Sequence, residues 1–196
     1  SGSMAMYDDD GDSTGWSSGL AAPPESRWGQ CVSACQAFLV AVQNTPMDEL
    51  VSLVTYSGAG TIDQDLTLQY SNILSSINGY TQAFHGGSTN IGDGIDKARQ
   101  TLRTRGFDRA WAEPTIVVMT DGQNTTGAIT PETAASNAAA AGITVHTITY
   151  GHDADQTRMQ TVATLGNGRH WHAPDSAALI QAFNQIAANS PTMLVE

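Results

Sequence analysis

The chain has 196 residues, of which 40% are hydrophobic and 14% charged, a balance typical of one globular domain with a substantial core. Eight Lys and Arg residues stand against nineteen Asp and Glu residues, so the formal net charge is −11, which argues against a basic nucleic-acid-binding surface. No apolar run reaches the roughly eighteen residues that a membrane-spanning helix needs, so we expect no span within this chain.

Hydrophobic periodicity predicts helices alternating with strands along most of the chain. Residues 1–24 are expected to form an acidic loop at the edge of a metal site. The predicted elements that follow are a helix at 26–43, strands at 50–56 and 61–66, helices at 70–77 and 90–104, a strand at 115–120, a helix at 131–141, a strand at 143–150, a helix at 155–165, a strand at 169–172 and a helix at 176–188. This order predicts a single α/β domain over residues 1–196, with a mostly parallel sheet and helices on both faces.

Oxygen-bearing side chains fall where predicted strands end and helices begin. Ser1 and Ser3 open the chain, Thr89 precedes the helix at 90–104, and Asp121 follows the strand at 115–120. Open α/β sheets bind ligands at such junctions. Hydroxyl and carboxylate oxygens suit hard divalent cations, with Mg²⁺ preferred here and Ca²⁺ or Mn²⁺ as alternatives. We therefore predict one divalent cation at Ser1, Ser3, Thr89 and Asp121.

These residues resemble the metal-ion-dependent adhesion site of von Willebrand factor A domains, in the segments Ser1-Gly2-Ser3-Met4, Thr89 and Asp121-Gly122. The resemblance covers the whole chain. It implies a doubly wound, Rossmann-like fold with one antiparallel edge strand. It also implies that the serine and threonine hydroxyls and the aspartate carboxylate hold the metal, and that an Asp or Glu of a partner protein fills a vacant position. The expected function is therefore a metal-dependent adhesion or assembly module and not an enzyme.

The chain departs from this family pattern at its start. The family motif begins with an Asp two residues upstream of Ser1, on the first central strand, and both the Asp and that strand are absent from this chain. We expect an extended segment from outside this numbering to lie between the strands at 50–56 and 115–120, supplied by a longer chain or by a bound upstream peptide. Pairing of residues 192–196 in that place, with Glu196 replacing the missing Asp, is the alternative.

Composition and resemblance together favour an exported protein. The chain is rich in Ser, Thr, Asn and Gly, and Arg27-Trp28 is similar to a pair in bacterial Tad-type pilus accessory proteins. We therefore expect an extracytoplasmic location in the periplasm, on the cell surface or outside the cell, with a membrane anchor upstream as one option. Two other functions stay open: a metal-assisted hydrolase, for which His85 is the plausible base, and a structural subunit of a pilus or surface assembly without a metal role.

Three further groups have two interpretations each. Cys31 and Cys35 share one helix face, as free buried thiols or as a strained disulfide. The acidic run at residues 8–12 is a solvated loop or a second Ca²⁺ site. His170 and His172 alternate along a strand, where packing is favoured over zinc binding because no Cys or Glu set accompanies them.

Overall fold

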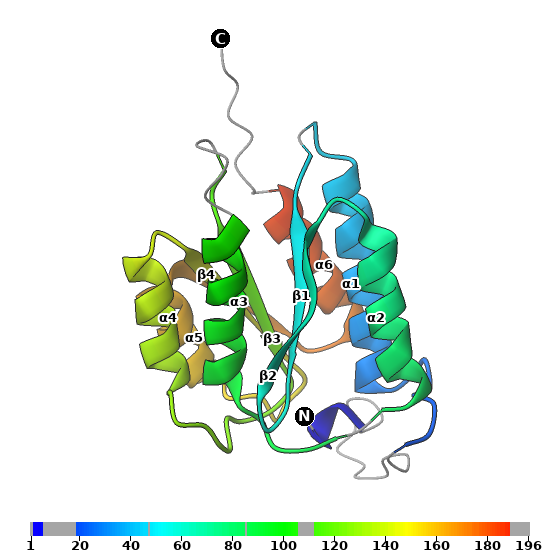
Figure 1. Ribbon diagram of the computed structural model, residues 1–196. Helices are drawn as coiled ribbons and strands as arrows, with labels where there is room; N and C mark the ends of the chain where they lie inside the picture. Colours follow the sequence, from blue (N-terminus) through cyan, green and yellow to red (C-terminus); the bar gives the residue numbers. More distant parts are fainter. Residues whose placement is uncertain (1, 6–18, 47, 85, 106–111, 189–196) are drawn as a thin grey trace.

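The computed structural model describes residues 2–5, 19–46, 48–84, 86–105 and 112–188. Its elements are η1 (Gly2–Ala5), α1 (Arg27–Gln43), β1 (Val51–Tyr56), β2 (Gly60–Thr67), α2 (Tyr70–Gln82), α3 (Ile91–Arg105), β3 (Thr115–Thr120), α4 (Pro131–Ala140), β4 (Thr144–Tyr150), α5 (Gln156–Leu165), β5 (Asn167–Ala173) and α6 (Ser176–Ala188). From α3 to α6, helices and strands alternate, as the α/β prediction requires (Figure 1).

The described strands form two sheets. β1 and β2 make an antiparallel hairpin, and β3, β4 and β5 make a parallel sheet with β4 in the middle. The predicted α/β class, with parallel strands and one antiparallel hairpin partner, is confirmed. The sheet is not continuous, however, because β1 and β3 have no pairing with each other in the described part of the chain.

Helices cover both faces of the parallel sheet. One core joins β3 and β4 to α3, α4 and α5, centred on Ile95, Val118 and Val145. The other core joins β4 and β5 to α1 and α6, centred on Ile148 and Phe183. In Figure 1, α3, α4 and α5 lie on the left, and α1, α2 and α6 lie on the right. The arrangement is the doubly wound one, since crossover helices sit on both sides of parallel strands.

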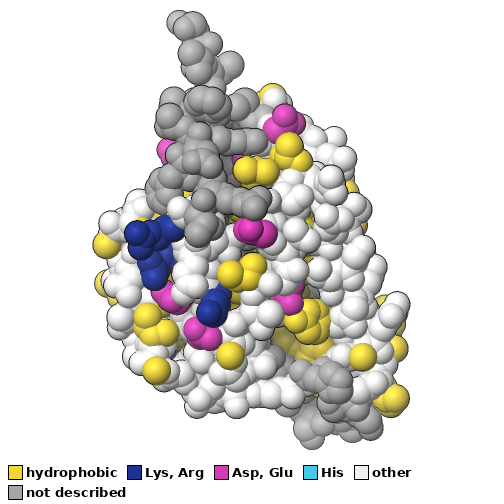
Figure 2. Space-filling model, in the orientation of Figure 1, with side chains coloured by type: hydrophobic (Ala, Val, Ile, Leu, Met, Phe, Trp, Pro, Cys, Tyr) yellow, Lys and Arg dark blue, Asp and Glu magenta, His cyan; other side chains and the backbone are white. Residues whose placement is uncertain are grey.

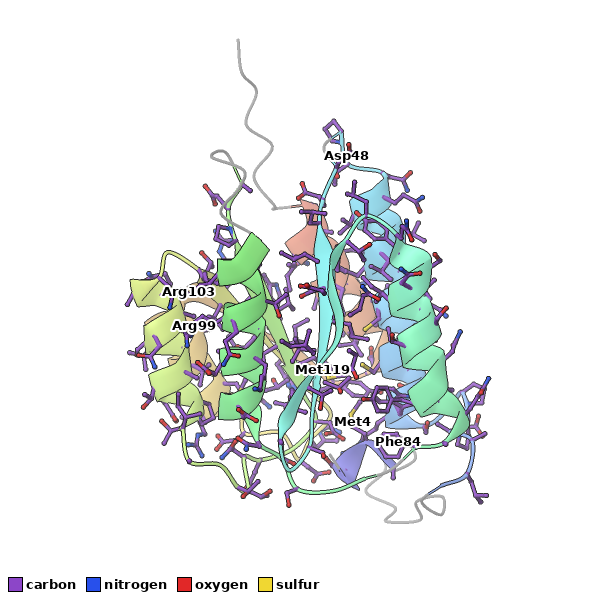
Figure 3. All side chains as sticks on the ribbon, in the orientation of Figure 1. Met4, Asp48, Phe84, Arg99, Arg103 and Met119 are labelled. Atoms are coloured by element: carbon purple, nitrogen blue, oxygen red, sulfur yellow. The ribbon has the colours of Figure 1, made fainter. Side chains whose placement is uncertain are left out.

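A groove separates the two sheets. It has a volume of about 660 Å³, and all six residues of β1 and all six of β3 line it, together with side chains from α1, α3 and α6. We call this space the central groove. Asp48 lies at one end of it, and Met119 lies near Met4 and Phe84 at the other (Figure 3). The groove therefore runs the whole length of both strands.

The helix boundaries follow local signals in the sequence. α1 begins after Ser26, whose hydroxyl accepts from the Gly29 backbone N–H at 3.1 Å, as an N-cap should. α4 begins at Pro131 behind the N-cap Thr130. The largest boundary error concerns α2, for which periodicity predicts an end at residue 77 and which continues to Gln82. Its extra turn carries Tyr80 and Thr81, which contact Trp28 of α1, so tertiary packing extends the helix.

Candidate metal-binding site at the end of β3

Asp121 follows the last residue of β3 and is 1% exposed. The Ser3 hydroxyl in η1 donates a hydrogen bond to its Oδ1 at 2.6 Å. Met4, the next residue, is buried against Ala22 and Phe84, and this packing holds η1 beside the end of the strand. Two of the four predicted site residues, 118 positions apart in the chain, are therefore in direct contact.

The carboxylate of Asp121 faces a buried cationic side chain. Arg27, at the first position of α1 and 3% exposed, places one guanidinium nitrogen 3.7 Å from Asp121 Oδ2 and the other 2.9 Å from Asp153. Within the described residues, Oδ2 of Asp121 is buried without a hydrogen-bond partner. Burial raises the pKa of the Asp121 carboxyl, and the Ser3 hydrogen bond and the Arg27 charge offset part of that rise. An additional cation at Oδ2 would satisfy this oxygen.

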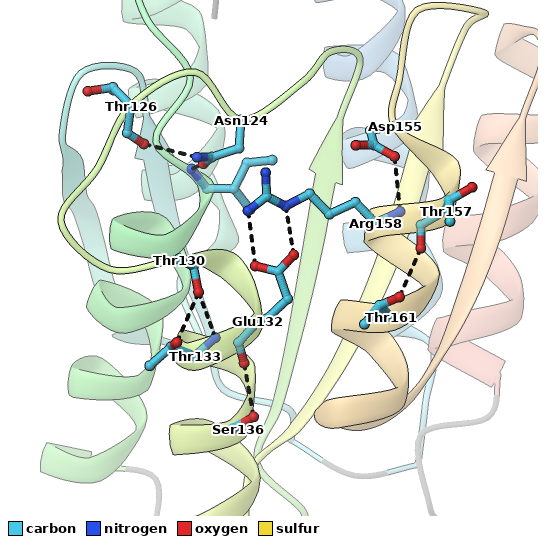
Figure 4. Close-up of polar contacts among 11 residues, drawn as sticks. Asn124, Thr126, Thr130, Glu132, Thr133, Ser136, Asp155, Thr157, Arg158 and Thr161 are labelled. Carbon is cyan, nitrogen blue, oxygen red and sulfur yellow. Dashed lines mark hydrogen bonds and ion pairs between the residues drawn. The ribbon is translucent and has the colours of Figure 1, made fainter.

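Thr89 is placed by the loop that follows Asp121. The Thr89 backbone N–H donates to the Thr125 hydroxyl at 2.8 Å, and the Thr125 N–H donates back to the Thr89 carbonyl at 2.8 Å. Asn124 accepts from the first backbone N–H of α3 and donates to the Thr126 carbonyl (Figure 4). Thr89 itself is 4% exposed. These reciprocal bonds hold the two loops together at the carboxyl edge of the parallel sheet.

A glycine makes this loop pairing possible. Gly127 has φ of +126°, and a Cβ built on it would lie 2.3 Å from the Asn90 side-chain oxygen. That oxygen accepts from the Asp93 N–H and so caps α3. Any larger residue at position 127 would disturb the cap directly behind Thr89.

Ser3 and Thr89 line one surface hollow of about 630 Å³. Its other lining residues are Gly87, Gly122, Gln123, Thr125, His152, Asp153 and Ala154. Asp121 lies beneath this hollow, bonded to Ser3 on one side and lining the central groove on the other. The structure thus brings the predicted residues Ser3, Thr89 and Asp121 to one place, whereas Ser1, His85, the acidic run at 8–12 and residues 192–196 lie outside the described residues.

The donors gathered here are hydroxyls and a single carboxylate. Among the described residues, no cluster of three or more His, Cys, Asp or Glu side chains could hold a metal ion. A site at Asp121 would therefore depend on Ser and Thr oxygens, which are weakly charged ligands suited to Mg²⁺ or Ca²⁺. The buried, unbonded Oδ2 of Asp121 fits such a cation, while the charge of Arg27 opposes it.

Arg27 and Asp153 are site residues that the sequence patterns did not predict. A signal for Arg27 exists in the sequence, because a cation at the first turn of a helix opposes the helix dipole. Its presence directly after the N-cap Ser26 indicates that anions lie nearby, and the structure supplies Asp121 and Asp153. Of the two interpretations of Cys31 and Cys35, the structure has free thiols and no disulfide between them. His170 and His172 share the Thr149 hydroxyl on one face of β5.

Comparison with known proteins agrees with this geometry. The family model of the von Willebrand factor type A domain matches residues 23–186. The chain belongs to this family, whose members are in general protein-interaction modules. A search of the curated proteins found no match.

Similar solved structures support the fold. The conserved hypothetical protein BatB from Bacteroides thetaiotaomicron is 17% identical with a TM-score of 0.72, over 97% of this chain and 94% of that one. An aerotolerance-related membrane protein from Bacteroides fragilis is 19% identical with a TM-score of 0.66, over 87% of this chain and 93% of that one. Proximal thread matrix protein 1 from the mussel byssus, in a structure with a zinc-occupied MIDAS motif, is 18% identical with a TM-score of 0.62, over 84% of this chain and 40% of that one.

Proposed function

We propose that this chain is a metal-ion-dependent protein-binding module of an exported protein, and that its cation takes a carboxylate from a partner. The ligands would be Ser1, Ser3, Thr89 and Asp121. The observation that carries the proposal is the state of the Asp121 carboxylate, which is 1% exposed and accepts a hydrogen bond from Ser3. Its other oxygen, Oδ2, is buried and has no hydrogen-bond partner among the described residues. A bound divalent cation supplies a Lewis-acidic position at which an external carboxylate can coordinate.

The protein's own residues prepare that position. The hydrogen bond from Ser3 orients the Asp121 carboxylate, and the paired loops around Thr89 and Thr125 form the wall of the hollow. Arg27 neutralises Asp121 in the absence of a metal. Arg27 also adds a positive charge that repels an incoming cation, so we expect cation affinity to be modest. Among divalent cations we propose Mg²⁺ first, with Ca²⁺ or Mn²⁺ as alternatives.

Two features favour an extracytoplasmic role in adhesion or assembly. One similar structure is described as a membrane protein, and another is described as the PilB minor pilin from Streptococcus sanguinis, with a TM-score of 0.65. Within the described residues, none of the helices combines the length and hydrophobicity needed to cross a bilayer.

The cation is tested by calorimetry with Mg²⁺, Mn²⁺, Ca²⁺ and Zn²⁺. The Asp121→Ala variant should lose binding, because it removes the only carboxylate among the proposed ligands. Asp96→Ala is the matched control, since Asp96 pairs with Arg99 on α3 and does not line the hollow. Equal affinity in the wild type and in Asp121→Ala would remove the metal assignment.

Partner binding is tested by capture from the surface or pilus fraction of the source, with and without chelator. We expect a partner that presents a local Asp or Glu and that is lost on chelation. The net charge of −11 repels an acidic partner at long range, so its affinity should rise with salt until screening saturates. Identical captured proteins under both conditions would contradict a role for the cation, and turnover in a hydrolase screen with Mg²⁺ or Mn²⁺ would favour the enzymatic alternative.

A further inference from the structure

Positive charge is concentrated in one short part of this acidic chain. Residues 96–109 hold five of the eight Lys and Arg residues but only two of the nineteen Asp and Glu residues, a formal charge of +3. The other residues together carry −14, from three positive and seventeen negative side chains. Three of the clustered cations, Lys97, Arg99 and Arg103, have described side chains on α3. On a molecule that repels anions elsewhere, this stretch is where an anion is attracted.

Two of these cations line a second surface hollow, between α3 and α4. The hollow has a volume of about 620 Å³, and its lining residues are Arg99, Arg103, Asn137, Ala140 and Ala141. We call it the arginine hollow. The two arginines are four positions apart on α3, so they lie on one face of the helix, beside α4 (Figure 3). Space remains there because α4 ends in a run of alanines, whose side chains are short.

Arg99 is fixed in place by a neighbouring carboxylate. Asp96 Oδ1 accepts from Arg99 Nε at 3.0 Å and from Arg99 Nη2 at 2.6 Å, and the two side chains are only 18% and 20% exposed. The third nitrogen of this guanidinium, Nη1, has no partner among the described residues. Asp96 therefore neutralises one charge and orients the guanidinium, while one nitrogen of Arg99 stays available to a ligand.

The other two polar groups of the hollow are available as well. Arg103 and Asn137 are exposed, and within the described part of the chain neither side chain has a hydrogen bond or an ion pair. A guanidinium offers five N–H donors and an asparagine amide offers two. Arg99 and Arg103 also repel each other, since like charges four positions apart on a helix are destabilising. An anion between them would remove that repulsion.

The number of donor groups indicates the kind of anion. Arg99, Arg103 and Asn137 present three separate donor groups from two helices. One arginine fork satisfies both oxygens of a carboxylate, whereas a phosphate group carries at least three acceptor oxygens and up to two negative charges. None of the five lining residues is aromatic, so the hollow offers no stacking surface for a base. The donor set therefore suits a phosphate group better than a carboxylate or a nucleotide base.

We propose that the arginine hollow is a binding site for a phosphate group, whether free in solution or on a lipid headgroup. The site is separate from the candidate metal site. Thr89 lies just before α3 begins at Ile91, whereas Arg99 is eight residues into the helix, about 12 Å along its axis. The inference rests on the arginine hollow alone and does not depend on the proposed cation.

The first test is a titration of the wild-type protein with inorganic phosphate at constant ionic strength, with acetate in a parallel titration. Divalent cations are removed beforehand on a chelating resin, because the carboxylates of a soluble chelator would compete for the site. The readout is NMR of the arginine guanidinium and asparagine amide groups. We expect saturating shifts at Arg103 and Asn137, with phosphate bound about 10-fold more tightly than acetate. Shifts that do not saturate, or equal affinity for both anions, would overturn the proposal.

Matched variants separate a site from general attraction. Arg103→Gln should weaken phosphate binding by about 10-fold or more, and Asn137→Ala by about 3-fold. Arg169→Gln is the control, because Arg169 is exposed on β5 outside the hollow and its loss changes the net charge by the same amount. Equal weakening by Arg103→Gln and Arg169→Gln would contradict a built site. Asp121→Ala should bind phosphate as the wild type does, and loss of binding in this variant would place the anion elsewhere.

The source of the phosphate is distinguished with vesicles of phosphatidylcholine, with and without phosphatidic acid, in a sedimentation assay. Binding that requires phosphatidic acid and is lost in Arg103→Gln supports the site and assigns it to a headgroup. Phosphate binding without vesicle binding supports the site and assigns it to a free phosphate. Vesicle binding that is unchanged in Arg103→Gln would overturn the hollow as the point of attachment. Since no divalent cation is present, failure here leaves the metal proposal standing, and failure of the calorimetry leaves this one standing.

Discussion

The parallel sheet and the hairpin differ in how completely their strands are enclosed. In β4, which has neighbours on both edges, Val145 and Ile148 are 0% exposed. All six residues of β1, which among the described residues pairs with a neighbour on one edge only, are half-buried, although both α1 and α3 contact this hairpin region. Enclosure of a strand therefore depends on its edges as much as on the helices that cover its faces. The difference between the two regions can be measured with matched substitutions.

The largest contrast is expected from truncating one apolar side chain in each region. Ile148→Ala empties a fully buried site in β4 and should cost about 3–4 kcal/mol. Leu53→Ala removes the same number of carbons from β1, at a half-buried site beside the central groove, and should cost about 1 kcal/mol. Denaturant unfolding measures both. Similar losses would show that β1 is already enclosed, and occupation of the groove by a strand should raise the cost of Leu53→Ala.

A smaller contrast is expected from two glycines. A Cβ on Gly168, at the start of β5, would lie 2.1 Å from the Val145 carbonyl oxygen, so Gly168→Ala should cost about 1–3 kcal/mol. A Cβ on Gly58, in the turn between β1 and β2, would have no atom within 4 Å, so Gly58→Ala should leave stability within about 0.5 kcal/mol of the wild type. Thermal unfolding distinguishes the two, and a large loss in Gly58→Ala would mean that the hairpin turn is tightly packed.

The smallest effect concerns an ion pair over the parallel sheet. Arg158 of α5 forms a two-pronged contact with Glu132 of α4 (Figure 4) and lowers the pKa of the Glu132 carboxyl. A lowered pKa gives stability that is present above the usual Glu range and is lost as pH falls through the lowered value. Both side chains are 30% exposed, so Glu132→Gln should cost only about 0.5 kcal/mol at neutral pH.

The pH dependence provides the control for that pair. The difference between wild type and Glu132→Gln should shrink as pH falls through the lowered pKa, because the wild-type carboxylate becomes neutral there. A difference that stays constant from neutral to acidic pH would indicate a packing effect in place of a charge effect.

The strands of the parallel sheet can be located from the sequence, because each is a short apolar run between clear turn signals. The run at 115–120 became β3 with the same bounds. The helix at 70–77 was predicted too short because the contacts of Tyr80 and Thr81 with Trp28 are tertiary and leave no periodic signal.

At the candidate site, the sequence predicts Ser3, Thr89 and Asp121 because hydroxyls and a carboxylate fall where predicted strands end and helices begin, and the structure brings these three residues close together. The Arg27 contacts were missed because they join residues about a hundred positions apart, and only the unfavourable place of Arg27 at a helix start hinted at them. The metal ligands and the extended segment in the central groove stay predictions.

The surface seen in Figure 2 is mostly uncharged, with scattered acidic side chains and a few basic ones near one edge. Proteins are the ligands to screen first, because von Willebrand factor type A domains are in general protein-interaction modules.

Asp153 places a negative charge at the opening of the surface hollow that Ser3 and Thr89 line. Its side chain is 62% exposed, lines the hollow and is tied to Arg27 beneath it. In the proposed function, the Asp153 carboxylate repels an acidic partner while the cation site is empty. Once the cation is bound, its charge outweighs that of Asp153 and attracts the acidic partner. The cation and the partner must then raise each other's affinity by the same factor. The domain would then bind its partner appreciably only where the cation and the acidic ligand are present together.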